Sequence, residues 1–191
     1  MPDDSEPLTG EALALDLVNT RPAQGNGDRT DLLATPAQLT RWLAAQAHRL
    51  PEGAETPAAS DLAPVHAVRA HAEAAVRALF DGAAPPAAAL RGLTAAQRAA
   101  PPVRELAWDG TAVTATPRRS GPLGVRLAAA LAESAADLLA DPAAAGRLRQ
   151  CEADGCVMLF LPAHPRRRWC SSARCGNRAR VARYYRRHNP A

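Results

Sequence analysis

Four cysteines constrain the fold of this chain more than any other feature. They form two C-x4-C pairs, Cys151 with Cys156 and Cys170 with Cys175, and thirteen residues separate the pairs. Each pair can close on one ion as a short knuckle, and two pairs supply the four thiolates that tetrahedral zinc prefers. The spacing therefore predicts a Zn²⁺ site that organises a small C-terminal module.

Disulfide bonds and an iron–sulfur cluster are the alternatives for these cysteines. Clustered cysteines in a reducing cytosol are more often ligands than disulfides, and the spacings do not fit the usual iron–sulfur runs. His164 and His188 are rival zinc ligands, but a set of four cysteines does not need them. We therefore expect one Zn²⁺ ion held by the four cysteines.

Charge is distributed unevenly along the chain. The net charge is +4, but residues 155–191 contain nine of the 23 basic residues and none of the 19 acidic ones, so this tail carries +9 and residues 1–154 carry −5. Such an asymmetry is expected where one end of a chain meets nucleic acid, although a solvated tail has the same composition. Because the chain contains no lysine, the use of arginine does not by itself indicate base reading.

Arginines of the tail are the candidate nucleic-acid contacts. Phosphate contacts position a protein without reading the sequence, so the DNA sequence stays unassigned. The tail has too few aromatic residues for a single-strand stacking platform, which favours duplex DNA. The alternative is a structural zinc module that docks on RNA or on an acidic protein. The candidate contacts are Arg166, Arg167, Arg168, Arg178, Arg180, Arg183, Arg186 and Arg187.

Residues 1–145 predict an α+β domain that is mostly helical and contains a small antiparallel β-hairpin. A capping box that begins at Thr35 marks one helix start. The Asp109-Gly110 pair between alternating runs predicts the hairpin, on which the helices are expected to pack. The first helix, capped by Thr9, also fits a strand pattern. We expect helices over residues 9–20, from 36, 62–80, 87–99, 123–140 and 143–150, and loops over 21–30 and 50–60.

Residues 146–191 predict a small four-cysteine zinc finger with a core of its own. The apolar run 157–161 is too short for a helix and predicts a strand that packs behind the metal. Phe160 and Trp169 are the natural core of this module.

A basic helix that ends near His188 is expected in the second half of the finger. Ser171 or Ser172 can cap it, which places Cys170 and Cys175 where a helix N-terminus favours thiolates. An apolar stripe on this helix is expected to dock against the zinc core and to leave the arginines to phosphates. The stripe contains Val181, Ala182 and Tyr185.

Two stretches of the chain carry a family resemblance. Cys175-Gly176-Asn177-Arg178, preceded by Arg168-Trp169-Cys170 and by a C-x4-C pair with Leu-Phe shortly after it, resembles the CGNR zinc-finger family. The segments LALDLVNT (residues 13–20) and TPAQLTRWL (residues 35–43) resemble the ABATE domain that accompanies this finger.

The resemblance implies a bacterial, stress-related transcription regulator whose finger binds DNA. It makes the four cysteines the zinc ligands, and Gly176, Asn177 and Arg178 the signature loop and helix start. From the residues themselves, Gly176 and Asn177 favour structural roles beside the metal. One departure is the linker Pro162-Ala163-His164, where many members have an aspartate and a serine.

A polar cluster in the first helical segment is the candidate site for an unknown small-molecule effector. It consists of Asp16, Asn19 and Thr20, with Arg21 beside them. In the alternative interpretation Asn19 and Thr20 only end a helix, while Asp16 is solvated or pairs with Arg21. The sequence contains no nucleophile and base arrangement, phosphate loop or H-E-x-x-H motif, so we expect no enzyme.

Location and assembly follow from weaker signals. No stretch reaches the roughly 18 apolar residues that span a bilayer, and residues 1–7 are acidic, unlike a secretory signal. We therefore expect a cytoplasmic protein that does not enter a membrane. One finger with a short helix offers a small footprint on DNA, which makes a homodimer a possible assembly.

Overall fold

The protein was analysed as a computed structural model, which describes residues 6–23, 29–50 and 55–188. Parts of the two predicted loops at 21–30 and 50–60 lie outside these ranges. The helices are α1 (Leu13–Val18), α2 (Pro36–Ala45), α3 (Leu62–Phe80), α4 (Ala87–Ala99), α5 (Leu123–Ala140), α6 (Pro142–Ala145) and α7 (Asn177–His188), with short turns η2 (Ala59–Asp61) and η3 (Ser172–Gly176). The strands are β1 (Val103–Trp108), β2 (Val113–Arg118), β3 (Arg149–Gln150) and β4 (Leu159–Phe160).

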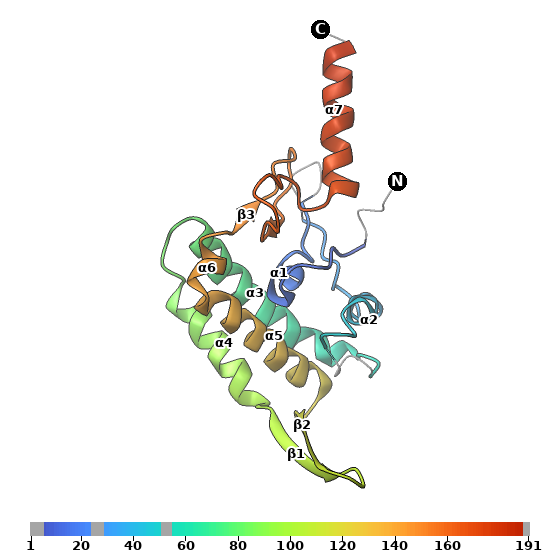
Figure 1. The fold of residues 1–191 in the computed structure, drawn as a ribbon, viewed down its shortest axis with the longest axis vertical. Helices are drawn as coiled ribbons and strands as arrows, with labels where there is room; N and C mark the ends of the chain where they lie inside the picture. The colour runs from blue at the N-terminus through green and yellow to red at the C-terminus, as the bar shows by residue number, and fades with distance from the viewer. Residues whose placement is uncertain (1–5, 24–28, 51–54, 189–191) are drawn as a thin grey trace.

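Helices α3, α4 and α5 pack against one another, and α1 lies across α3 and α5 (Figure 1). Their apolar faces meet in one core, to which α2 adds Trp42 and Leu43. Val65, Val68 and Val76 on α3 are fully or almost fully buried, as the helical spacing predicts. The α+β class, mostly helical with a small antiparallel hairpin and a C-terminal cysteine cluster, is confirmed.

Two helix starts show how local chemistry sets the boundaries. The Thr35 side chain accepts from the Gln38 amide at 3.2 Å, and the Thr35 amide donates to Gln38 Oε1 at 2.9 Å, so the predicted capping box is confirmed. The predicted cap at Thr9 is wrong, because α1 begins only at Leu13. Instead, the Asp16 carboxylate accepts the amides of Gly10 and Glu11 from within the helix.

The hairpin differs from the prediction in its packing. Strands β1 and β2 pair antiparallel, and Gly110 in their connection has φ +101°, which only glycine adopts easily. All but one of its twelve strand residues are exposed, and the ribbon projects from the end of α4 and α5 (Figure 1). The helices therefore do not pack on this sheet, because they already bury their apolar faces against one another.

The predicted helix over 143–150 is shorter in the structure, because a strand replaces its second half. Helix α6 ends at Ala145, and Arg149 and Gln150 form β3, which pairs with β4. The predicted strand over 157–161 is confirmed in its centre by β4. Helix α7 then leaves the body at the end opposite the hairpin (Figure 1). Among the described residues, no helix combines the length and apolar character needed to cross a membrane.

Candidate metal centre and basic helix

The four cysteine sulfurs lie within 4.8 Å of one another. Cys156 Sγ is 3.9 Å from Cys170 Sγ and 3.8 Å from Cys175 Sγ, and Cys170 and Cys175 Sγ are 3.5 Å apart. A Zn–S bond of about 2.3 Å places the sulfurs of a tetrahedral site about 3.8 Å apart. The donor set and its spacing therefore fit Zn²⁺, and all four thiols are free of disulfides.

The first cysteine pair is built by a tight turn at the base of a small hairpin. Gly155 has φ +69°, a left-handed conformation that lets the chain close between the two cysteines. The amide of Cys151 donates to the Met158 carbonyl at 3.0 Å, which continues the β3–β4 ladder up to the ligand. The backbone of Met158 also hydrogen bonds to the Cys156 sulfur, so the chain itself supports the thiolate.

The second cysteine pair is held at the start of the basic helix. Ser171 caps η3 by accepting from the Arg174 amide at 3.2 Å, which decides between the two serines predicted as caps. Cys175 lies in η3, two residues before α7 begins at Asn177. The predicted position of Cys175 at the helix start is therefore confirmed, but its pKa is raised by the neighbouring sulfurs and not lowered by the helix start.

Crowding of the four sulfurs perturbs their acidity in opposite directions. Interaction with Cys151 and then Cys156 raises the pKa of Cys170 and of Cys175. Hydrogen bonds with Cys156 and Cys170 lower the pKa of Cys151. A divalent cation removes this conflict, because it takes the place of the thiol protons.

The three residues after Cys175 support the metal loop. A Cβ on Gly176 would lie 3.1 Å from Trp169 Cδ1, so a side chain there would press on the indole. Asn177 donates to the Ala173 carbonyl at 2.8 Å, inside the loop that joins the second cysteine pair. Arg178 Nη2 lies 3.4 Å from Cys175 Sγ, where its charge stabilises the ligand. These contacts favour structural roles for the signature residues.

Arg167 is a structural residue rather than an open phosphate contact. Its guanidinium pairs with Glu11 at 2.6 Å and donates to the Cys170 carbonyl at 2.7 Å. The same group lies 4.4 Å from the ring centroid of Phe160. Sequence reasoning grouped it with its exposed neighbours because nothing in a run of three arginines marks which one turns inward.

We expect Arg167→Ala to destabilise the finger by about 1 to 3 kcal/mol, because hydrogen bonds to a charged group are lost. Arg166→Ala is the matched control, since Arg166 is exposed and its side chain makes no hydrogen bond or ion pair among the described residues. The rate of zinc release to a chelator measures the difference. Equal rates for the two variants would contradict the inward role of Arg167.

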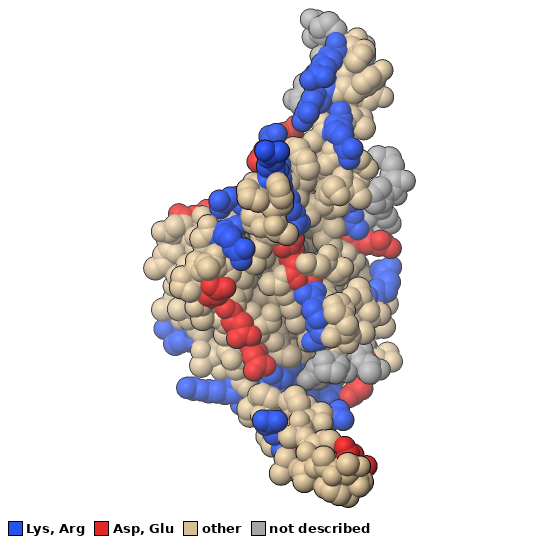
Figure 2. Space-filling model, viewed as in Figure 1, with Lys and Arg blue, Asp and Glu red and all other residues tan. Residues whose placement is uncertain are grey.

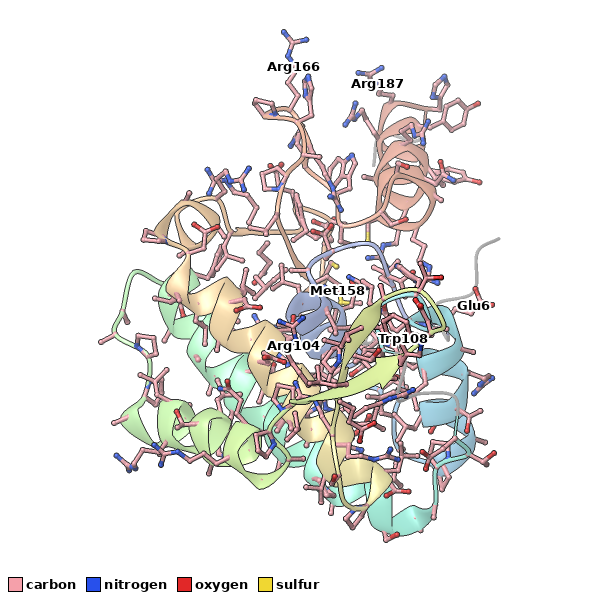
Figure 3. The ribbon with its side chains drawn as sticks, turned by 60° about the horizontal axis from the view of Figure 1, so that its bottom comes forward. Glu6, Arg104, Trp108, Met158, Arg166 and Arg187 are labelled. Carbon is pink, nitrogen blue, oxygen red and sulfur yellow. The ribbon has the colours of Figure 1, made fainter. Side chains whose placement is uncertain are left out.

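Three predicted arginines share one side of α7. Arg180, Arg183 and Arg187 follow one another at spacings of three and four, which places them on the same helix face. All three are exposed, and Arg180 binds the Gly176 carbonyl and Asn177 Oδ1. Basic side chains run along α7 and the adjoining loop in Figure 2. Arg166 and Arg187 both extend beyond the body at this end (Figure 3).

Other predicted contacts are only partly available. Arg168 is exposed, but it pairs with Glu152 and lies 5.1 Å from the Trp169 ring centroid. The side chain of Arg186 lies outside the described part of the structure. The basic face of α7 therefore rests on Arg180, Arg183 and Arg187, with Arg166 as the neighbouring charge.

The apolar stripe of α7 does not dock against the zinc core, so that prediction is wrong. Val181 is 53% exposed and Tyr185 is 60% exposed. Arginines flank the stripe, and docking it would bury their guanidinium groups without partners, which costs more than the small stripe returns. Tyr184 instead stacks on His188 with ring centroids 4.1 Å apart.

The finger is joined to the helical body by contacts that the sequence did not predict. Asn19 Nδ2 donates to the Leu159 carbonyl at 2.7 Å, and the Leu159 amide donates to Asn19 Oδ1 at 3.0 Å. Arg77 donates to the Val157 carbonyl at 3.0 Å, and Glu11 accepts the Leu161 amide at 3.0 Å. Leu159 is fully buried in the core of the body. The finger is thus fixed to α1 and α3 through β4.

The four residues predicted as an effector site have intramolecular partners. Asp16 is fully buried and binds Arg49 and Gln46, not Arg21. Thr20 accepts from the buried Arg69 at 3.0 Å. Arg21 lies 3.6 Å from Glu73. Asn19 is bound to β4, so each of the four is already engaged within the chain, and these contacts favour the structural interpretation.

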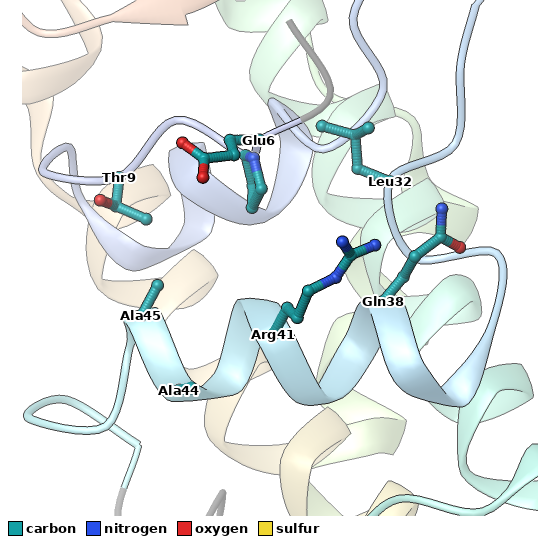
Figure 4. A pocket seen from close by; sticks show the side chains of 8 residues that line it. Glu6, Thr9, Leu32, Gln38, Arg41, Ala44 and Ala45 are labelled. Carbon is teal, nitrogen blue, oxygen red and sulfur yellow. The ribbon is translucent and has the colours of Figure 1, made fainter. Parts of the chain in front are cut away.

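A different cavity, of about 430 Å³, lies between the N-terminal segment and α2 (Figure 4). Glu6 and Arg41 are its charged groups, and Thr9 and Gln38 add polar atoms. Glu6 also contacts the finger, because its carbonyl accepts from Arg174 at 2.5 Å. None of the predicted effector residues lines this cavity.

The fold and the site together define a class of protein. A helical body carries a small finger whose four cysteines are positioned to hold a zinc ion, and an arginine-rich helix follows the last ligand. This arrangement is that of a zinc-finger protein whose finger is attached to a helical body.

Family comparisons give the same order of parts. The sequence model of the ABATE family, described as "Putative stress-induced transcription regulator", matches residues 11–142, and the CGNR zinc finger matches residues 147–188. The chain therefore belongs to the ABATE family and carries a CGNR finger, as its motifs predicted. Both families are regulatory or zinc-finger types rather than enzyme families. No curated protein matches the chain.

Proposed function

We propose that this protein is a bacterial, cytoplasmic transcription regulator that binds duplex DNA through its zinc finger. In this proposal residues 1–145 form the regulatory domain, and residues 146–191 form the DNA-binding finger. The observation that carries the proposal is the exposed face of Arg180, Arg183 and Arg187 on a helix that stands clear of the body.

The shape of α7 favours duplex DNA over the alternatives. A helix with its side chains is about 10 to 12 Å wide, and the major groove of B-DNA is about 12 Å wide. Since α7 packs substantially only on η3 among the described elements, most of its surface is open to such a groove. An RNA duplex has a deep and narrow major groove that excludes a helix, so RNA is the weaker candidate.

We expect the double variant Arg183→Ala, Arg187→Ala to bind a labelled DNA duplex about 10- to 100-fold more weakly at low salt. The slope of log Kd against log salt should fall by about two, because two phosphate contacts are lost. Fluorescence anisotropy over a salt series measures both quantities. The matched control is Arg91→Ala with Arg98→Ala, which removes the same charge from exposed positions on α4.

Equal losses in the two double variants would show that only net charge matters and would contradict the role of α7. Binding to duplex RNA that is tighter than binding to duplex DNA would favour the structural RNA-docking alternative.

A further inference from the structure

A second exposed face of α7 lies beside the face of its arginines. Its residues follow one another at spacings of three and four, so they share one side of the helix. All of them are exposed, although none is charged at neutral pH apart from a histidine. We call this surface the aromatic face of α7, and it consists of Val181, Tyr184, Tyr185 and His188.

The aromatic face is ordered by contacts among its own rings. The rings of Tyr184 and Tyr185 meet edge to face with centroids 5.8 Å apart, and Tyr184 stacks on His188. Nδ1 of His188 also lies 2.9 Å from the carbonyl oxygen of Tyr184. Tyrosine rings supply a large contact area at a low cost in side-chain entropy. The face is thus suited to contact a flat partner without much further ordering.

The position of this face relative to the arginines suits a helix that lies in a groove. Successive residues turn by about 100° around a helix, so the aromatic face is centred roughly 100° from the face of Arg180, Arg183 and Arg187. The phosphates line the walls of the major groove and the base edges form its floor, at about a right angle to the walls. When the arginines lie against the phosphates of one wall, the aromatic face therefore turns toward the base edges.

This inference rests on the proposed DNA binding. We propose that the aromatic face reads A·T base pairs in the major groove through the C5-methyl group of thymine, with Val181 and Tyr185 as the contacting residues. All the arginines and none of the acidic residues of the tail accompany this face, so its partner has to be an anion that also presents an apolar group. Thymine presents such a methyl group among the phosphates of duplex DNA, and apolar side chains are its usual contacts.

Two duplexes of about 20 base pairs, or two helical turns, test the proposal. Both have the same alternating A·T sequence, but one carries deoxyuridine in place of thymidine, so only the C5-methyl groups differ. We expect the wild type to bind the thymidine duplex about 4- to 15-fold more tightly, because each buried methyl group contributes about fourfold. Fluorescence anisotropy with the full chain measures both dissociation constants.

Two double variants separate base contacts from phosphate contacts. Val181→Ala with Tyr185→Ala should bring the ratio of the two dissociation constants close to one and leave the salt dependence unchanged. Arg183→Ala with Arg187→Ala is the matched control, which should weaken binding to both duplexes equally and keep the ratio. Alanine is a strong helix former, and circular dichroism with zinc analysis confirms that each variant is folded.

Equal affinity of the wild type for the two duplexes, with normal salt dependence, would overturn the reading of thymine and leave the proposed DNA binding intact. The aromatic face would then be open to a protein partner. A ratio that survives in Val181→Ala with Tyr185→Ala would overturn the inference as well. Binding to neither duplex would instead contradict the proposed function itself, so the two failures are distinguishable.

Discussion

Cys156→Ser is expected to abolish zinc binding and to unfold the finger. Cys156 lies within 4 Å of two other ligand sulfurs, and a serine oxygen is a poor replacement for one of four thiolates. Zinc binding to such modules supplies about 10 to 16 kcal/mol, far more than a core of this size can. Purified wild type should contain about one zinc per chain and the variant almost none.

Metal analysis and amide hydrogen exchange measure this effect together. The amides around the four cysteines should lose their exchange protection in the variant, whereas α3 and α5 keep theirs because they lie in the core of the body, to which Leu159 also belongs. Ser172→Ala, a change at an exposed position between Cys170 and Cys175, is the control. Full zinc occupancy in Cys156→Ser would contradict the four-thiolate site.

Asp16→Ala is expected to lower the free energy of unfolding by about 3 to 5 kcal/mol, the usual cost of removing one partner from a buried ion pair. The carboxylate is fully buried and accepts from Gln46 at 3.0 Å, from the amides of Gly10 and Glu11, and from Arg49. Its loss takes an acceptor away from all these donors.

Urea unfolding of the helical body measures the change. Asp137→Ala is the matched control, because Asp137 is exposed on α5, and it should cost less than about 0.5 kcal/mol. If Asp16→Ala costs no more than the control, Asp16 is free for a ligand after all.

Sequence reasoning succeeded where a pattern is local. The spacing of the cysteines, the capping box at Thr35 and the periodicity of α3 and α5 depend on neighbouring residues, and each element formed as expected. The long-range partners were not predictable. Asp16 looks solvated in the sequence, because its partner Arg49 lies 33 residues away.

The same reason explains the arginines of the finger. Arg166 and Arg167 are adjacent, yet one is exposed and the other pairs with Glu11, which belongs to the N-terminal segment. The exposure of the hairpin and of α7 was not predictable either, because it depends on where the other helices pack. Such information is held in the packing of the whole molecule and not in the residue pattern of one segment.

Contacts between the finger and the helical body fix the position of α7. The finger carries α7, and the hydrogen bonds between Asn19 and Leu159 join the finger to α1, so they tie the position of α7 to the body.

The carboxylate of Glu73 supports a second link between the body and the finger. Burial raises the pKa of Glu73, but hydrogen bonds from Arg29 and Arg77 lower it by more, so the pKa lies below its ordinary value. Arg77, which bonds to Val157, is therefore anchored by a carboxylate that stays charged at neutral pH.

The central claim is that a zinc ion builds the surface that binds DNA. Its most direct test is the affinity of the full chain for a DNA duplex, measured by anisotropy before zinc chelation, after it, and after zinc is added back. We predict salt-dependent binding that is lost on chelation and restored by zinc. Binding that survives complete removal of zinc would contradict the account.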